Sequence, residues 1–123
     1  MRRFYILVFV LLATAFSRGD ASVMPNQDAA KVNAKYINVK LDNARVRVFE
    51  STLKPGEKEA LHSHPASIIY VIEGGKFRNH TADGAVSEGE LKTGDVQYRE
   101  PLTHWAENIG TTTSRLVIVE LKN

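Results

Sequence analysis

Short turn signals recur along the chain from residue 35 onward, and helical spacing is hard to find between them. Each signal contains a glycine, and the signals are Pro55-Gly56, Gly74-Gly75, Asp83-Gly84, Gly94-Asp95 and Ile109-Gly110. The runs between them are short and rich in β-branched and aromatic residues, which favour strands. Eight or nine strands at this spacing predict an all-β sandwich or barrel, because each strand must bury one face against a second sheet.

Two pairs of runs define the expected sheets most clearly. The runs at residues 36–41 and 46–53 flank an Asp-Asn turn, so they are predicted to form a hairpin. Residues 67–73 contain IIYVI and residues 114–122 contain RLVIVEL, which are apolar at both alternating sets of positions. Such runs are typical of strands that are buried on both faces, so these two are predicted to be core strands inside a closed double sheet.

Residues 1–21 have the order of a secretory signal peptide. Two arginines precede an apolar run at residues 4–13, and small residues follow the run. A membrane anchor is the alternative, but a spanning helix needs about 20 apolar residues and this run is shorter. We therefore expect an exported protein, periplasmic or secreted, with cleavage of the leader after Ala15 or near Ala21.

The charge balance of the mature chain argues against a nucleic-acid partner. The full sequence has 16 Lys and Arg against 14 Asp and Glu. Cleavage at either position makes the two counts equal, and the remaining basic residues are scattered among acidic ones. Phosphate neutralisation needs a basic stripe instead. We expect neither nucleic acid nor, after leader removal, a membrane as partner.

Residues 22–34, ahead of the first predicted strand, are expected to be irregular. They are polar, contain a proline and show no sustained period. The remaining residues, 35–123, are expected to form one domain. The sequence contains no cysteine, so stability must come from a packed core, although export would permit disulfides.

Two histidines, His62 and His64, stand one residue apart directly before the apolar run at residues 67–73. Successive side chains alternate on a strand, so these two project to the same side with Cα atoms about 6 to 7 Å apart. Both imidazoles can then reach one ion at bond lengths of about 2.0 to 2.1 Å. The pair alone is weak evidence for a site and favours a structural or surface role.

The spacing around these histidines resembles the first motif of the cupin superfamily. Gly56 is followed after five residues by the triplet His62-Ser63-His64, and Gly75 follows later at the expected distance. A second stretch of the chain resembles the second cupin motif. There, a histidine is followed after three residues by an asparagine, and a Gly-Asp pair precedes the strand.

The second stretch places His104 and Asn108 in the matching positions. The resemblance covers the chain from about residue 35 onward and implies a jelly-roll barrel, the double-stranded β-helix of RmlC-like proteins. It also implies that His62, His64 and His104 hold a divalent transition metal inside the barrel, with Fe, Zn, Mn and Ni as candidates. A small-molecule ligand or substrate and a homodimer paired through the sheets are implied in the same way.

The chain departs from the cupin pattern at two points. The glutamate of the first motif is replaced by Ile68, or by Ser67 or Ile69 if the register shifts, and none of these is a carboxylate. The second motif lacks its Pro-x-Gly, because Pro101 stands only three residues before His104. Three neutral ligands leave the charge of a divalent ion uncompensated, so we expect anions to bind the ion directly.

Two functions are compatible with this pattern. Three-histidine shells occur with catalytic zinc, and the thiol dioxygenases, which are cupins, use three histidines on iron(II). The first hypothesis is therefore a metal-dependent enzyme, dioxygenase-like or isomerase-like, acting on a small molecule. The alternative is a noncatalytic barrel that binds a small ligand or a metal, since no catalytic acid or base can be named from the sequence.

Other polar and aromatic residues have simpler expected roles. His80 lies next to a turn and is expected to be an exposed loop histidine, away from the metal site. Trp105 is expected to face the side of its strand opposite the preceding histidine and to pack in the core. One of the residues Gln97, Tyr98 and Arg99 is expected to contact a substrate in the cavity, depending on the register.

Overall fold

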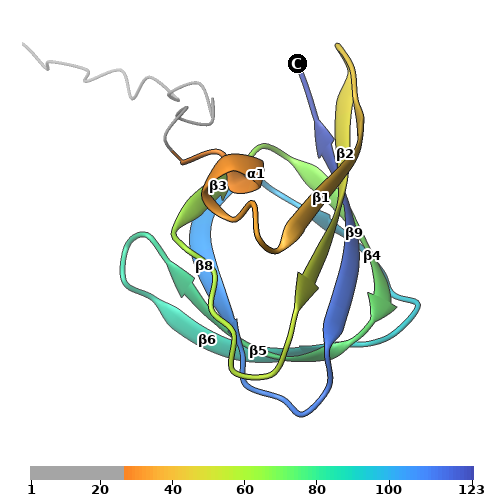
Figure 1. Ribbon diagram of the computed structural model, residues 1–123. Helices are drawn as coiled ribbons and strands as arrows, with labels where there is room; N and C mark the ends of the chain where they lie inside the picture. The colour runs from red at the N-terminus through yellow and green to blue at the C-terminus, as the bar shows by residue number, and fades with distance from the viewer. Residues whose placement is uncertain (1–26) are drawn as a thin grey trace, which may run out of the picture.

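The strands of residues 27–123 form two antiparallel sheets that lie face to face (Figure 1). The strands are β1 Ile37–Asp42, β2 Val46–Leu53, β3 His62–His64, β4 Ser67–Glu73, β5 Gly75–Thr81, β6 Val86–Leu91, β7 Val96–Arg99, β8 Leu102–Asn108 and β9 Ser114–Leu121. The larger sheet has the order β1-β2-β9-β4-β7, and the smaller has the order β3-β8-β5-β6. The computed structural model describes residues 27–123, so the expected signal peptide lies outside the described residues.

The winding of the chain is that of a jelly roll. From β2 to β9 the chain crosses between the sheets at every connection except the β5–β6 hairpin. The first two strands pair antiparallel, as the Asp-Asn turn predicts. The all-β double-stranded β-helix expected from the sequence is therefore confirmed.

One helical turn, α1 (Ala29–Val32), lies in the segment that was expected to be irregular. Asp28 caps it, because its carboxylate accepts a hydrogen bond from Lys31 N at 3.2 Å. Ala29 is fully buried against the core, which anchors the turn beside β3 (Figure 1). A single turn is too short to give a periodic signal, so the expectation of an irregular segment was wrong here. Within residues 27–123, no helix has the length and hydropathy that a membrane span requires.

The core lies between the two sheets and is built mainly from alternate residues of the larger sheet. Its fully packed members come from α1, β2, β4 and β9, and they are Ala29, Phe49, Ile69, Val71 and Ile118. Alternation sends their neighbours in sequence to the outer face of the sheet. The polar cluster described below occupies the other part of the interior.

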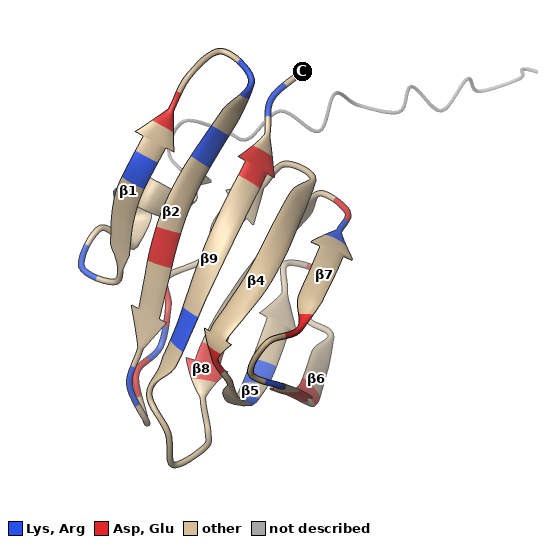
Figure 2. Cartoon of the chain, turned by 90° about the vertical axis from the view of Figure 1, so that its right-hand side faces the viewer, with Lys and Arg blue, Asp and Glu red and all other residues tan. Residues whose placement is uncertain are grey.

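The outer face of the larger sheet is apolar but uncovered by the described residues. Ile68 and Tyr70 of β4 are 38% and 47% exposed, so the expectation that the IIYVI run is buried on both faces was wrong. Pairing registers align an apolar row across all five strands, consisting of Leu41, Val48, Val119, Ile68 and Tyr98. Figure 2 shows that charged residues are absent from the middle of β4 and β9.

Two residues of the cupin-like motifs have a structural role at one end of the barrel. Gly56 has a φ of +83°, a left-handed conformation that glycine adopts without strain. Its N–H donates to the carbonyl of Asn108 at 2.8 Å. The buried Asn108 side chain donates to the carbonyls of Leu53 and Thr112. The two motifs are thus joined by the loops that precede β3 and follow β8.

Candidate metal centre

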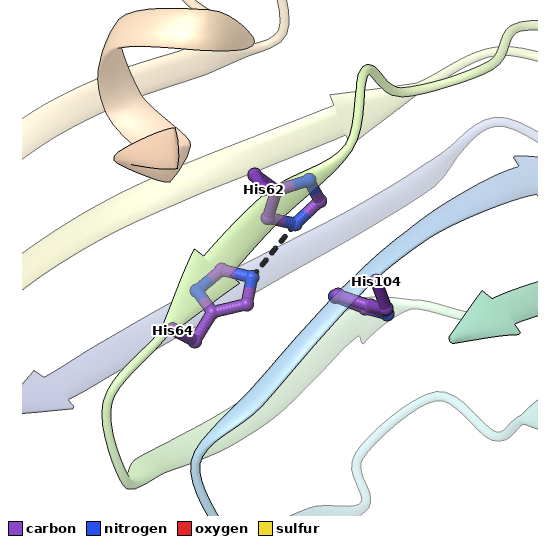
Figure 3. Close-up of side chains that lie close together, drawn as sticks. All are labelled: His62, His64 and His104. Atoms are coloured by element: carbon purple, nitrogen blue, oxygen red, sulfur yellow. Dashed lines mark hydrogen bonds between the residues drawn. The ribbon is translucent and has the colours of Figure 1, made fainter. Parts of the chain in front are cut away.

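Strand pairing brings the two histidine motifs together. β3 pairs with β8, and His62 lies directly opposite His104 in the register. His64 is two residues from His62 on the same strand, so its side chain projects to the same side. Figure 3 shows the three rings pointing toward one another. The structure therefore brings together the three residues that the sequence indicated as ligands.

The three imidazoles are buried and close enough to share one ion. The Nε2 atoms of His62 and His64 are 2.9 Å apart. One ligand nitrogen from each of the three rings lies within 4.8 Å of the others. Donor atoms on one ion with bonds of about 2.0 to 2.1 Å are about 3 Å apart in cis positions. The His62–His64 separation therefore matches two cis ligands, and the ring of His104 lies beside them.

The ring orientation of two histidines is fixed by oxygen acceptors. His104 Nδ1 lies 2.5 Å from Asn79 Oδ1, and His64 Nδ1 lies 2.9 Å from Glu120 Oε2. An oxygen acceptor requires the proton on Nδ1, which leaves Nε2 with a bare lone pair in the neutral ring. His104 Nε2 is buried and has no hydrogen-bond partner among the described residues. A buried bare nitrogen of this kind fits a cation.

His62 is held by the N-terminal segment. Its Nδ1 lies 2.7 Å from the carbonyl oxygen of Ala60 and 2.9 Å from Asn33 Nδ2. Asn33 also accepts a hydrogen bond from Ala60 N at 2.7 Å. When Nδ1 donates to the Ala60 carbonyl, Nε2 presents its lone pair toward the other two histidines. The segment after α1 therefore positions one of the three rings.

Burial keeps at least two of the histidines neutral. Burial, together with the neighbouring His64, lowers the pKa of His62 to about 4. Burial lowers the pKa of His104 to about 2, and the nearby His62, His64 and Arg99 act in the same direction. Metal ligation requires the deprotonated imidazole. Both rings are therefore in the ligand form at neutral pH.

The site lacks a carboxylate at the position of the motif glutamate. Ile68 points to the outer face, and Ser67 and Ile69 point inward without charge. A carboxylate instead comes from β9, where Glu120 pairs in register with Ser67 and accepts the hydrogen bond from His64. This carboxylate orients a histidine, as outer-shell carboxylates of metal sites do.

Glu120 is in turn neutralised by Arg47. Arg47 Nε donates to Glu120 Oε1 at 2.7 Å, and its Nη1 donates to Asp28 Oδ2 at 2.8 Å. Sequence reasoning missed Glu120. The available signal was a glutamate at an alternating position within the apolar run RLVIVEL. A charged residue in such a run is buried only when it is paired.

A second carboxylate, Glu59, lies at the edge of the cluster. Its Oε2 is 3.9 Å from His62 Nε2 and accepts a hydrogen bond from Ala106 N at 3.0 Å. Burial raises the pKa of Glu59 to about 7, against the opposing effects of the Ala106 N–H and the charge of Arg99. It is one of the five unspecified residues between Gly56 and His62, so no spacing argument indicated it.

A cavity of about 300 Å³ adjoins the histidines. His64, His104, Glu59 and Arg99 contribute to its wall. Of the three candidates for a substrate contact, Tyr98 is 58% exposed on the outer face, while Arg99 lines the cavity. The arrangement can therefore hold a small molecule beside an ion.

The surroundings of His80 and Trp105 differ from those expected from the sequence. His80 belongs to β5, is half-buried and stacks on Trp105 with 3.6 Å between ring centroids. The prediction of an exposed loop histidine was wrong, because β5 extends to Thr81. Trp105 faces away from His104, as expected, but packs on His80 instead of in the core. His80 takes no part in the three-histidine cluster.

Comparisons with known proteins agree on the fold. A cupin domain from Bordetella pertussis Tohama I is 27% identical, with a TM-score of 0.65, covering 71% of this chain and 92% of that one. An uncharacterized conserved protein with a double-stranded β-helix domain from Klebsiella pneumoniae is 26% identical, with a TM-score of 0.55, covering 73% and 87%.

More distant structures show the same architecture. An RmlC-like cupin family protein from Methanocaldococcus jannaschii is 18% identical, with a TM-score of 0.56, covering 73% of this chain and 84% of that one. No model of a protein family and no curated protein matches the chain. The jelly-roll winding, the motif spacing and these structural matches together show that the chain is a member of the cupin superfamily.

Proposed function

We propose that the protein is an exported metal-dependent enzyme whose ion is held by His62, His64 and His104. The observation that supports this proposal is the convergence of ligand nitrogens from three buried imidazoles beside a cavity. A divalent iron, zinc, manganese or nickel ion at this position supplies a Lewis acid or, for iron, a redox centre. The resemblance to cupins favours dioxygenase-like or isomerase-like reactions on a small molecule.

The chain's own residues supply orientation and a site for a proton. Asn79 and Glu120 hold the rings of His104 and His64 through Nδ1. Glu59 Oε2 lies at the cavity wall, and its pKa near neutrality suits it to accept and return a proton there. This carboxylate is the acid or base that the sequence did not reveal.

A noncatalytic barrel that binds a metal or small ligand is the second candidate. The missing motif glutamate favours it, since Ile68 faces outward. A substitution at Glu59 distinguishes the enzyme from the noncatalytic barrel. In an enzyme, Glu59→Gln should lower turnover by about 100-fold or more while the ion stays bound, which is the usual size of an acid–base contribution. A noncatalytic barrel has no turnover to lose.

The test begins with metal analysis of the mature protein purified without chelator. We expect one ion per chain, and we expect the cobalt-substituted form to change its visible spectrum when azide is added. Three neutral ligands leave open positions and uncompensated charge, so an anion should bind the ion directly. Substoichiometric metal that cobalt or zinc cannot restore would exclude a metal-dependent activity.

Export is part of this proposal. Two arginines and the apolar run at residues 4–13 support it. N-terminal sequencing of the protein recovered from the periplasm or medium should give a mature terminus after Ala15 or near Ala21. An intact Met1 on protein recovered from the cytoplasm would contradict export.

A second copy of the chain is the partner that best fits the outer face of the larger sheet. The apolar row from Leu41 to Tyr98 crosses all five strands, and its members Leu41, Ile68 and Tyr98 are exposed in the single chain. Light scattering should show a dimer that Tyr98→Glu converts to a monomer. Val86→Glu is the control, because Val86 is 57% exposed on the other sheet. A wild-type monomer at every concentration would exclude this dimer.

A further inference from the structure

Arg99 is an inward-facing cation at the wall of the cavity. β7 alternates between exposed and half-buried residues, with Val96 and Tyr98 outside and Gln97 and Arg99 inside. Ser67, which is buried, pairs in register with Arg99 on the neighbouring strand. The cavity wall includes the Arg99 side chain. The guanidinium of Arg99, at the end of β7, therefore lies on the inner side of the barrel.

Arg99 differs from Arg47, Arg78 and Arg115 in its lack of a protein partner. Arg47 pairs with Glu120 and Asp28, Arg78 pairs with two glutamates, and Arg115 pairs with Glu50. Within residues 27–123, the half-buried Arg99 forms no ion pair or side-chain hydrogen bond. The five N–H donors of Arg99 are available to a molecule in the cavity.

The surroundings place this guanidinium near the candidate metal centre. The charge of Arg99 contributes to the lowered pKa of His104 and opposes the raised pKa of Glu59. It is therefore close to both residues, yet it makes no ion pair with Glu59. A ligand held by Arg99 would lie next to the three histidines.

The rest of the cavity is small and mostly apolar. Its volume is about 300 Å³, at the lower end of ligand pockets, which suits a molecule of a few heavy atoms. Its apolar lining comes from both sheets and consists of Phe77, Leu91, Leu102, Leu116 and Ile118. Glu88 and Glu90 border it, but they alternate with the inward residues of β6, and Glu88 pairs with Arg78.

We propose that Arg99 anchors the carboxylate of a small organic acid whose short apolar part occupies the cavity beside the three histidines. This inference rests on the proposed function in that the same cavity receives the substrate. A guanidinium binds a planar carboxylate through two parallel hydrogen bonds. Phosphate is a poorer match, because its higher charge would meet a single cation with Glu59 close by. The chemical class of the ligand is therefore a monocarboxylic acid.

The experiment uses butyrate as the probe, with butyramide, butylamine and inorganic phosphate for comparison. Each is titrated by NMR into the mature chain, with zinc bound and without metal, while the Arg99 Nε–H signal is followed. Butyrate should shift this signal in both forms, and the other three should bind at least about tenfold more weakly, since losing a charge-assisted pair costs about a factor of ten or more.

Two variants complete the test. Arg99→Gln should weaken butyrate binding by about tenfold or more in the metal-free protein, while Arg99→Lys should retain part of it. Zinc stoichiometry should be unchanged in both. Arg115→Gln, on the outer face, is the matched control and should bind butyrate like the wild type.

The outcomes separate this inference from the proposed function. Equal affinity for butyrate and butyramide in the wild type, or preferred uptake of butylamine or phosphate, would overturn the carboxylate assignment even if a variant failed to fold. Butyrate binding that is unaffected by Arg99→Gln would overturn the role of Arg99. Failure to bind any metal would instead exclude the metal-dependent enzyme, while butyrate binding to the metal-free protein would still support Arg99.

Discussion

His104 and His80 lie on neighbouring strands of the smaller sheet and face opposite sides of it. In the β5–β8 register, Thr81 pairs with His104 and His80 pairs with Trp105. Both histidines have a buried Nε2 without a hydrogen-bond partner among the described residues. A buried unpartnered nitrogen therefore cannot by itself distinguish a ligand from a packed side chain.

The two rings differ in what surrounds that nitrogen. His104 Nε2 faces two further imidazoles, and its Nδ1 is held by Asn79. His80 lies flat on Trp105, with Nε2 3.7 Å from Glu107. Inside the barrel, one ligand nitrogen from each of three rings lies within 4.8 Å of the others. Outside, an aromatic face covers the ring, and the nearby group is a carboxylate instead of further imidazoles. Convergence of donor atoms is what indicates a site.

The strongest test of this comparison removes each ring in turn. His104→Ala should weaken zinc binding by more than about 100-fold, because loss of a ligand exceeds the 10- to 100-fold cost of losing an outer-shell partner. His80→Ala should leave zinc affinity unchanged. Competition with a chromophoric chelator measures both constants. Equal zinc affinity in the two variants would contradict the assignment of His104, and not His80, as a metal ligand.

The next test compares the carboxylates beside the two faces. Glu120→Gln should weaken zinc binding by about 10- to 100-fold, because the amide no longer holds the proton of His64 on Nδ1 as firmly. Glu107→Gln, beside His80, should leave zinc affinity unchanged. Thermal melting of both variants should accompany the titration, since Glu120 also pairs with Arg47. A folded Glu120→Gln protein with full zinc affinity would contradict an orienting role.

Local patterns in the sequence were sufficient for the all-β class and for two of the three histidines. Turn pairs and β-branched runs predicted the strands, and alternation placed His62 and His64 on one side. His104 was indicated only by its resemblance to the second cupin motif. Its position opposite His62 is a matter of strand register, which the β3 and β8 segments do not specify by themselves.

The supporting residues depend on register even more strongly. Asn79 reaches His104 from β5, and Glu120 reaches His64 from the far end of the chain. Glu59, from the loop before β3, and Arg99, from the end of β7, both line the cavity. No spacing rule connects such residues. The sequence could therefore predict ligands within one strand but not the neighbours that orient them.

A third prediction concerns pH. The unfolded value for histidine is 6.5, and burial lowers the pKa of His62 to about 4 and that of His104 to about 2. Below 6.5 the unfolded chain binds more protons than the folded chain, so stability is full above that pH and falls as the solution is acidified. Each such histidine changes the unfolding free energy of the metal-free protein by about 1.4 kcal/mol per pH unit.

Urea unfolding of the metal-free protein at pH 7 and pH 5 measures this loss. His104→Gln should reduce the acid sensitivity by about the contribution of one histidine, because glutamine does not titrate. Glu59 acts in the opposite direction. Its pKa rises from 4.5 to about 7, so its contribution is present below 4.5 and is lost as the pH rises through 7. Identical pH dependence in wild type and His104→Gln would contradict a neutral buried His104.

The smallest expected effect concerns the stacked pair on the outer face. His80→Ala removes the ring that lies 3.6 Å from Trp105 and should lower the unfolding free energy by about 0.5 to 1.5 kcal/mol, as expected for an aromatic pair. Trp105 is the only tryptophan in the sequence, so its fluorescence reports this environment directly. Val86→Ala is the control, because Val86 pairs with His80 in register but is 57% exposed. A red-shifted emission with unchanged zinc affinity would assign His80 to packing, whereas reduced zinc affinity in His80→Ala would show that the two faces of the sheet are coupled.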